Sequence, residues 1–176
     1  MATAHTSSSS KSSKARRTRR TGRRDPKAIQ VLKKDHREVE HMFDEYEQLE
    51  EEQEKLELFQ RIAVALKVHT QVEEELFYPA ERGEVEDDLL DEAYVEHDSA
   101  KKMIAEIEKM QPSDEFYDAK VKVLGEYVKH HIKEEEQPGG VFAQAKKGDE
   151  DLNAMGERIQ ERMEELKAKL GGRKAS

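Results

Sequence analysis

The sequence predicts an all-α protein in which four antiparallel helices pack as a bundle, with a basic N-terminal tail and an additional C-terminal helix. Apolar residues recur at helical spacing in five segments. Only four prolines and nine glycines occur, and most lie in the tail or between these segments. Charged residues make up 40% of the chain and hydrophobic residues 35%, which is typical of slender helices with one buried face.

The first helix is predicted to begin at residues 25–26 and to run to about Glu52. Asp25 is a good N-cap residue, and Pro26 suits the first helical position. The end of this helix is inferred mostly from symmetry, because residues 50–55 contain no glycine or proline. Its predicted core stripe consists of Ile29, Leu32, His36, Val39, Phe43 and Tyr46.

Glycine and proline mark the next boundaries more firmly. Gly83 separates the second helix from the third, residues 112–114 separate the third from the fourth, and residues 137–140 end or kink the fourth. The three core stripes are Phe59, Ile62, Leu66, His69, Glu73, Leu76; Leu90, Ala93, His97, Ala100, Ile104, Ile107; and Tyr117, Val121, Leu124, Val128, His131, Glu135.

A fifth amphipathic segment follows, so that the chain divides into a tail (1–24), a bundle (25–147) and a C-terminal helix with a short tail (148–176). Two packings are open for this helix: against its own bundle, which is simpler, or against another subunit. Its stripe consists of Leu152, Met155, Ile159, Arg162 or Met163, Leu166 and Leu170.

Four histidines lie at nearly equal distances from the three predicted turns. They are His36, His69, His97 and His131, and the midpoints of successive pairs fall at 52.5, 83 and 114. Because each helix climbs about 1.5 Å per residue, two residues equidistant from a turn lie at the same height. The four imidazoles should therefore meet in one layer of the core.

Two glutamates join this layer, Glu73 one turn after His69 and Glu135 one turn after His131. One unsatisfied buried polar group costs roughly 1 to 3 kcal/mol, so six such groups without partners would be strongly destabilising. A pair of divalent or trivalent metal ions supplies a partner for all six. Four imidazoles with two carboxylates suit a dinuclear iron centre.

The motifs around these residues resemble the hemerythrin-like, HHE cation-binding domain over roughly residues 26–146. They are Asp35-His36, the stretch from His69 to Pro79, Glu96-His97, and His130-His131-Ile-Lys-Glu134-Glu135-Glu136. The resemblance implies an up-down-up-down four-helix bundle that holds two non-haem iron ions. It carries ligand roles onto His36, His69, Glu73, His97, His131 and Glu135, with Glu73 and Glu135 as bridging carboxylates.

The resemblance further implies a protein that binds, senses or reacts with oxygen, peroxide or nitric oxide, or that buffers iron. No dedicated enzyme is predicted, and weak peroxidase, catalase or oxidase activity stays open. Oxygen-carrying hemerythrins have a further histidine where this chain has Lys101, which argues against reversible oxygen carriage. Glu135 and Glu136 compete for one bridging role, and Glu135 is favoured because a spacing of four returns to the same helix face.

Other polar residues are expected on the surface. His41 and His130 point away from the core stripes, and the acidic residues Glu74 and Glu75 are interpreted as a solvated face. Three other functions compete with the iron centre. Ferritin-like storage and a zinc hydrolase lack their motifs, whereas an acidic helical interaction module without metal remains the main alternative.

Charge divides the chain unevenly. Residues 1–24 carry eight basic residues and no acid, so subtracting plus 8 from the overall charge of minus 9 leaves minus 17 on residues 25–176. The tail is predicted to be disordered, and two roles are open: contact with nucleic acid or another polyanion through residues 11–24, or loose folding onto the acidic body. With no cysteine and no long apolar run, the protein is expected to be cytoplasmic, without thiolate metal sites.

Overall fold

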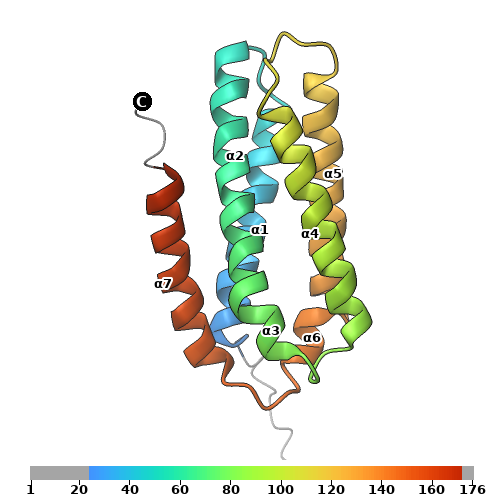
Figure 1. The fold of residues 1–176 in the computed structure, drawn as a ribbon, viewed down its shortest axis with the longest axis vertical. Helices are drawn as coiled ribbons and strands as arrows, with labels where there is room; N and C mark the ends of the chain where they lie inside the picture. The colour runs from blue at the N-terminus through green and yellow to red at the C-terminus, as the bar shows by residue number, and fades with distance from the viewer. Residues whose placement is uncertain (1–23, 172–176) are drawn as a thin grey trace, which may run out of the picture.

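Four long helices form an antiparallel bundle in the structure, a computed structural model that describes residues 24–171 (Figure 1). They are α1 (Lys27–Tyr46), α2 (Glu52–Val72), α4 (Asp87–Ile107) and α5 (Tyr117–Glu136). The described residues include no β-strand, which confirms the all-α prediction. The predicted breaks at Gly83 and at residues 112–114 both fall between helices.

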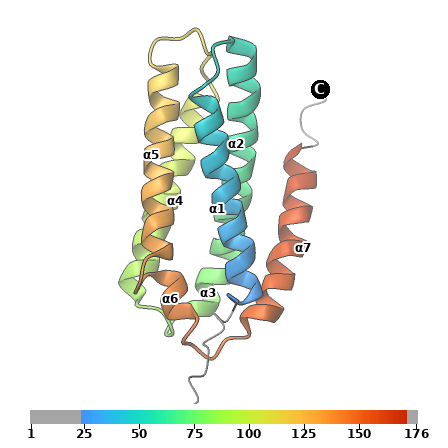
Figure 2. The ribbon, with the colours of Figure 1, turned by 180° about the vertical axis from the view of Figure 1, so that it is seen from behind.

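The first helix is shorter at both ends than predicted. Pro26, not Asp25, precedes its first residue, and the Asp25 carboxylate pairs instead with the ammonium groups of Lys33 and Lys146, each at 2.9 Å. The helix ends at Tyr46, six residues early, because residues 47–49 close it with tightened turns and half-buried Leu49 packs back on the core. Figure 2 shows α2 rising above the end of α1 as a result.

A widened helical segment, which the sequence analysis did not predict, follows α2. The π-helix η1 (Glu73–Phe77) leads into the short helix α3 (Tyr78–Glu81), and the Tyr78 amide donates to the Glu73 carbonyl five residues before it. Pro79 has no amide proton to continue regular helical bonding. The shift in register turns the Tyr78 side chain into the core, where it is fully buried.

The fourth helix ends just past Glu135, as predicted. Gly139 adopts a positive φ of 91°, and a side chain on Gly140 would meet the Glu134 carbonyl oxygen at 2.1 Å. Only glycine permits so close a return of the backbone. The chain then forms a short helix, α6 (Val141–Ala145), that brings Phe142 back beneath the bundle.

The C-terminal helix α7 (Leu152–Gly171) packs on its own bundle against α1 and α2, on the side away from α4 and α5 (Figures 1 and 2). Its predicted stripe is buried apart from Leu170, which is half-buried, and Met163 rather than Arg162 faces inward. Arg162 pairs with Glu75 of η1 at 2.8 Å. The simpler of the two expected packings is therefore the one observed.

The core consists of two apolar clusters with a polar layer between them. One cluster lies at the α3, α6 and α7 end, and the other lies at the far end among α1, α2, α4 and α5. Buried histidine and glutamate side chains occupy the level between the clusters. Among the described residues, no helix combines the length and the apolar character that crossing a membrane requires.

Candidate metal centre

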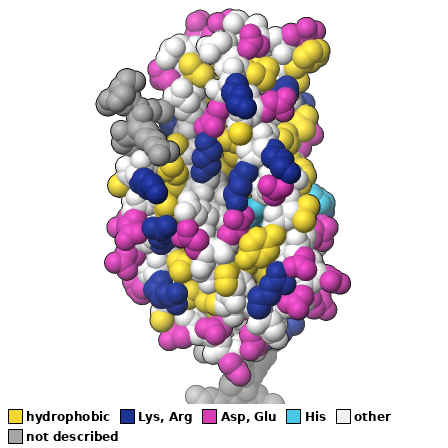
Figure 3. All heavy atoms as spheres, in the orientation of Figure 1, with side chains coloured by type: hydrophobic (Ala, Val, Ile, Leu, Met, Phe, Trp, Pro, Cys, Tyr) yellow, Lys and Arg dark blue, Asp and Glu magenta, His cyan; other side chains and the backbone are white. Residues whose placement is uncertain are grey.

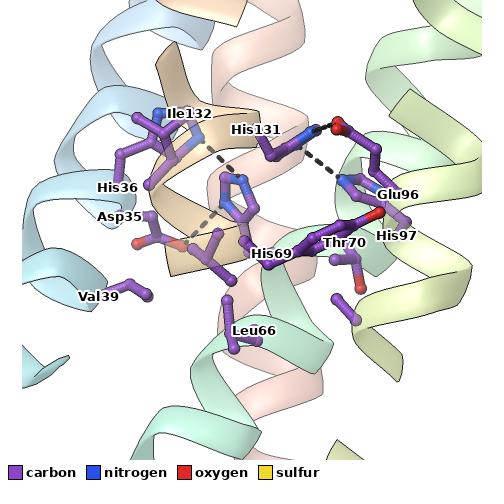
Figure 4. Close-up of a pocket in the computed structure, with 13 residues that line it drawn as sticks. Asp35, His36, Val39, Leu66, His69, Thr70, Glu96, His97, His131 and Ile132 are labelled. Carbon is purple, nitrogen blue, oxygen red and sulfur yellow. Dashed lines mark hydrogen bonds and ion pairs between the residues drawn. The ribbon is translucent and has the colours of Figure 1, made fainter. Parts of the chain in front are cut away.

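The four predicted histidines meet in one buried layer, arranged as two pairs (Figure 4). The Nε2 atoms of His36 and His69 lie 3.1 Å apart, and those of His97 and His131 also lie 3.1 Å apart. Each pair comes from one hairpin of consecutive helices, α1 with α2 and α4 with α5. The four histidines therefore lie at one height, as predicted, even though the first turn lies nearer to His36 than predicted.

Each of the two predicted glutamates spans both histidine pairs. Glu73 Oε2 lies 3.1 Å from His69 Nε2 and 3.4 Å from His97 Nε2. Glu135 Oε2 lies 3.3 Å from His36 Nε2 and 3.8 Å from His131 Nε2. Both carboxylates are buried. All six predicted residues thus surround one small volume, with carboxylates placed between two groups of imidazoles.

A second carboxylate stands behind each histidine at Nδ1. His36 Nδ1 lies 2.8 Å from Glu136, His97 Nδ1 3.1 Å from Glu74, and His131 Nδ1 2.7 Å from Glu96. His69 Nδ1 faces Asp35 at the longer distance of 3.7 Å. These carboxylates are the sequence neighbours of the layer residues, and they hold the imidazoles so that Nε2 points inward.

The electrostatic field at the layer favours positive charge. Burial alone would lower the pKa of His69, but the carboxylates of Glu73 and Asp35 raise it to about 10. Burial likewise opposes protonation of His97, and Glu73 and Glu74 raise its pKa. The pKa of Glu73 is held well below its usual value by His69 and His97 despite complete burial. The raised pKa values of the two imidazoles and the lowered pKa of Glu73 show that the layer favours a protonated imidazole beside an ionised carboxylate, a charge pattern that attracts cations.

Two aromatic residues that were not predicted as site residues complete the layer. The Tyr78 hydroxyl donates to Glu135 Oε1 at 2.8 Å and lies 3.3 Å from both Glu73 Oε2 and His97 Nε2. Phe142 stacks on His36 with ring centroids 5.6 Å apart. Tyr78 belongs to the recognised stretch from His69 to Pro79, but only the π-helical register turns it inward.

Several residues near the layer lie as expected, and one does not. Glu135 points inward while Glu136 lies outside, and the side chain of His130 is 60% exposed. Glu74 is not a simple solvated side chain, because it bonds both His97 and the Lys101 ammonium, the latter at 2.6 Å. Lys101 therefore points to Glu74 and leaves the layer without a fifth imidazole.

A cavity of about 20 Å³ adjoins the histidines on the side away from Glu73 and Glu135. Its apolar walls come from both hairpins, and the closest polar groups are the histidines and two of the outer carboxylates, Asp35 and Glu96 (Figure 4). A volume of this size holds roughly one water-sized molecule. The apolar lining consists of Val39, Leu66, Ala100, Val128 and Ile132, with Thr70 and Tyr127 beside them.

The fold and the layer define a class of four-helix-bundle proteins with a cation site of histidines and carboxylates in the core. The chain belongs to the Hemerythrin HHE cation binding domain family, whose model matches residues 27–138. Metal binding is thus a property of the family to which the chain belongs.

One solved structure and one curated protein show the range of similar proteins. A Hemerythrin HHE cation binding domain-containing protein from Mycobacterium kansasii, an Rv2633c homolog, shares the fold with a TM-score of 0.69 and 23% identity, covering 81% of this chain and 88% of that one. A DNA nickase from Nostoc sp. (strain PCC 7120 / SAG 25.82 / UTEX 2576) is 29% identical over 113 residues. That match covers 64% of this chain but only 32% of the nickase.

Proposed function

We propose that the layer holds two non-haem iron ions and that the protein binds, senses or reacts with oxygen, peroxide or nitric oxide, or buffers iron. The observation that carries this proposal is the contact between His97 and His131. Their Nδ1 atoms both donate to carboxylates, so both Nε2 atoms present lone pairs to each other at 3.1 Å. That contact is favourable when a cation, either a proton or a metal ion, lies between the two atoms, and Glu73 and Glu135 beside it offer further ligands to a metal ion.

Unpartnered atoms around the layer support the same assignment. Glu73 Oε1, Glu135 Oε2 and His69 Nδ1 are buried without a hydrogen-bond partner. Native proteins leave few such groups, since each costs about 1 to 3 kcal/mol. Six donors of this kind fit iron well, because imidazole and carboxylate are both ligands that it accepts.

The protein residues would divide the work as follows. His36 and His69 would hold one ion, His97 and His131 the other, and Glu73 and Glu135 would bridge them. Iron would supply one-electron redox chemistry. Tyr78 would hold a proton at its hydroxyl, 2.8 Å from Glu135, and the cavity would admit only a ligand of a few atoms. A missing fifth histidine leaves room for such a ligand and favours reaction or sensing over carriage.

Metal content tests this proposal directly. Anaerobically purified protein should contain about two irons per chain and should gain near-ultraviolet charge-transfer absorption when exposed to air. The double substitution His69→Ala with His131→Ala removes one imidazole from each pair and should abolish loading. The matched control, His41→Ala, removes an exposed histidine and should load fully. Full loading of the double variant would refute the ligand set, and a wild type that takes up no metal would favour the acidic interaction module.

A second function, nicking or binding of DNA, is favoured by the Nostoc DNA nickase and by the basic residues 11–24. We propose that these residues, which lie outside the described part of the chain apart from Arg24, contact nucleic acid by neutralising phosphates. Such contacts weaken steeply as salt is raised.

Supercoiled plasmid distinguishes binding from cleavage. Metal-loaded protein should retard the plasmid in a salt-dependent manner and convert it to the open circular form. Replacing the eight basic residues by serine in the full chain should abolish retardation, whereas the double histidine variant should still retard the plasmid, because the buried layer makes no contact with phosphates. Equal, negligible binding by the wild type and the serine variant would exclude the nucleic-acid role.

A further inference from the structure

The two histidine pairs have similar surroundings inside the layer, but the residues on their outer sides differ. In each hairpin an acidic residue precedes the first histidine: Asp35 in one and Glu96 in the other. The residues preceding the second histidine and its glutamate are Val68 and Val72 in the first hairpin. In the second hairpin they are His130 and Glu134.

The first of these surfaces is sealed. Val68 and Val72 are fully buried in the apolar cluster that α7 completes. Above them, Lys167 of α7 brings its ammonium to 3.9 Å from Asp35. The carboxylate behind His69 is thus covered by a helix and faced by a lysine of the chain.

The second surface is open and lacks such a lysine. Ligand atoms of Glu96, His130 and Glu134 lie within 4.8 Å of one another, and His130 Nε2 is 3.1 Å from Glu134 Oε1. Within residues 24–171, no lysine or arginine ion-pairs with either glutamate. Figure 3 shows histidine atoms among acidic side chains on the α4 side of the molecule.

We infer that Glu96, His130 and Glu134 form a second, solvent-open site for a divalent first-row transition metal, and that ions pass from it to the interior layer. One imidazole and two carboxylates are a donor set that such ions accept. His130 and Glu134 are one turn apart on α5, so both can bind the same ion. Two carboxylates that face each other without a lysine call for a cation between them.

Glu96 connects this outer site to the interior. Its Oε2 atom lies 2.7 Å from His131 Nδ1, and its side chain also lines the cavity beside the histidine layer. No other residue belongs to both the outer cluster and that cavity lining. An ion held by Glu96 is therefore separated from the layer by one side chain. The loading role rests on the proposed iron centre, whereas the outer site does not.

Anaerobic titration with Fe²⁺ alone tests the inference by stoichiometry and by rate. The wild type should bind three ions per chain, the third more weakly. The double substitution His130→Ala with Glu134→Gln should reduce this to two and should slow filling of the interior by about tenfold, the scale on which outer carboxylates influence metal sites. Filling is followed by near-ultraviolet absorption after mixing with air, and stoichiometry by equilibrium dialysis.

The chain offers a matched control in His41 and Glu45, which are also one turn apart on an exposed helix face. Converting them to alanine and glutamine should change neither number nor rate. Saturation of the wild type at two ions would overturn the outer site, and an unchanged filling rate in the His130 and Glu134 variant would overturn the loading route. Binding of a single ion that this variant loses would keep the outer site and overturn the dinuclear centre instead.

Discussion

The two halves of the bundle present the same residues to the centre and opposite surroundings to the outside. Each hairpin supplies two histidines, one spanning glutamate and two outer carboxylates. Behind the first hairpin lie two buried valines and α7, and behind the second lie an exposed histidine, His130, and a half-buried glutamate, Glu134. The two halves therefore present the same types of side chain to the layer, but only the second leaves residues behind its histidines accessible to solvent.

The two halves also differ in the aromatic ring that each places against the histidine layer. The first half places Tyr78 against His97, with ring centroids 5.4 Å apart, and the second places Phe142 against His36. Each ring covers a histidine of the opposite hairpin, but only Tyr78 carries a hydroxyl that donates into the layer. Of the two rings, therefore, only that of the first half supplies a hydroxyl donor to the layer.

The largest effect on stability is expected when a glutamate is placed on the sealed surface of the first hairpin, at the position where the open surface of the second hairpin has one. Val72→Glu buries a carboxylate without a partner beneath α7, so the free energy of unfolding should fall by about 3 kcal/mol or more. Its mirror image, Glu134→Val, alters an accessible side chain and should change stability by less than about 1 kcal/mol. Denaturant titration of metal-free protein measures both. Equal losses would mean that the two surfaces are not different.

An intermediate effect is expected at Glu81, at the end of α3. This carboxyl is buried without a partner, and its burial raises its pKa from 4.5 to about 7. Because the folded state favours the neutral form, the contribution of Glu81 to stability is greatest below pH 4.5 and is lost as pH rises from 4.5 to about 7.

The loss should be on the order of 1 to 3 kcal/mol by pH 8. Glu81→Gln should remove this pH dependence, measured as the difference in Tm between variant and wild type at pH 5 and pH 8. An identical difference at the two pH values would show that Glu81 is ionised throughout. The corresponding residue of the second half is Ala145, at the end of α6, which is also buried but has no ionisable group. The pH dependence expected at the end of α3 therefore has no counterpart at the end of α6.

The smallest effect separates two of the buried phenols, Tyr78 and Tyr117. Tyr78→Phe removes the only hydroxyl within residues 24–171 that donates to Glu135 and should cost about 1 to 2 kcal/mol. It should also shift the absorption of the loaded centre. Tyr117→Phe removes a buried hydroxyl without a partner, so it should be neutral or slightly stabilising and should leave the spectrum unchanged. Thermal unfolding and absorption spectra distinguish them, and indistinguishable variants would contradict the special role of Tyr78.

The histidine layer could be predicted because helical rise is nearly constant, so heights follow from counting residues. The first turn could not be placed well. Residues 47–51 contain no glycine or proline, and α1 ends there through the packing of Leu49, a tertiary contact that leaves no local signal. The residue spacing still predicted that His36 and His69 lie at one height, since the whole bundle rather than the turn holds them together.

The sequence pattern could not predict the register of η1 or the carboxylates that lie at the Nδ1 atoms of the histidines. A π-helical turn differs from an α-helical one by one residue, and its position depends on where Tyr78 finds partners in the finished core. Glu74 resembled a solvated side chain because its helix neighbours are acidic. A usable signal was present: an acidic residue adjoins four of the six layer residues, namely His36, Glu73, His97 and Glu135. Each of Asp35, Glu74, Glu96 and Glu136 approaches the histidine of another helix.

The location of each histidine pair within one hairpin sets the order in which the centre assembles as the chain folds. The paired histidines are only 33 and 34 residues apart, whereas the bond between His36 and Glu136 closes a loop of 100 residues. Shorter loops close with less loss of entropy, so each hairpin can form by itself before the two dock. Synthesis therefore delivers two separate two-histidine units, and the complete layer of four histidines and two glutamates exists only after α5 has been made and has joined the first hairpin.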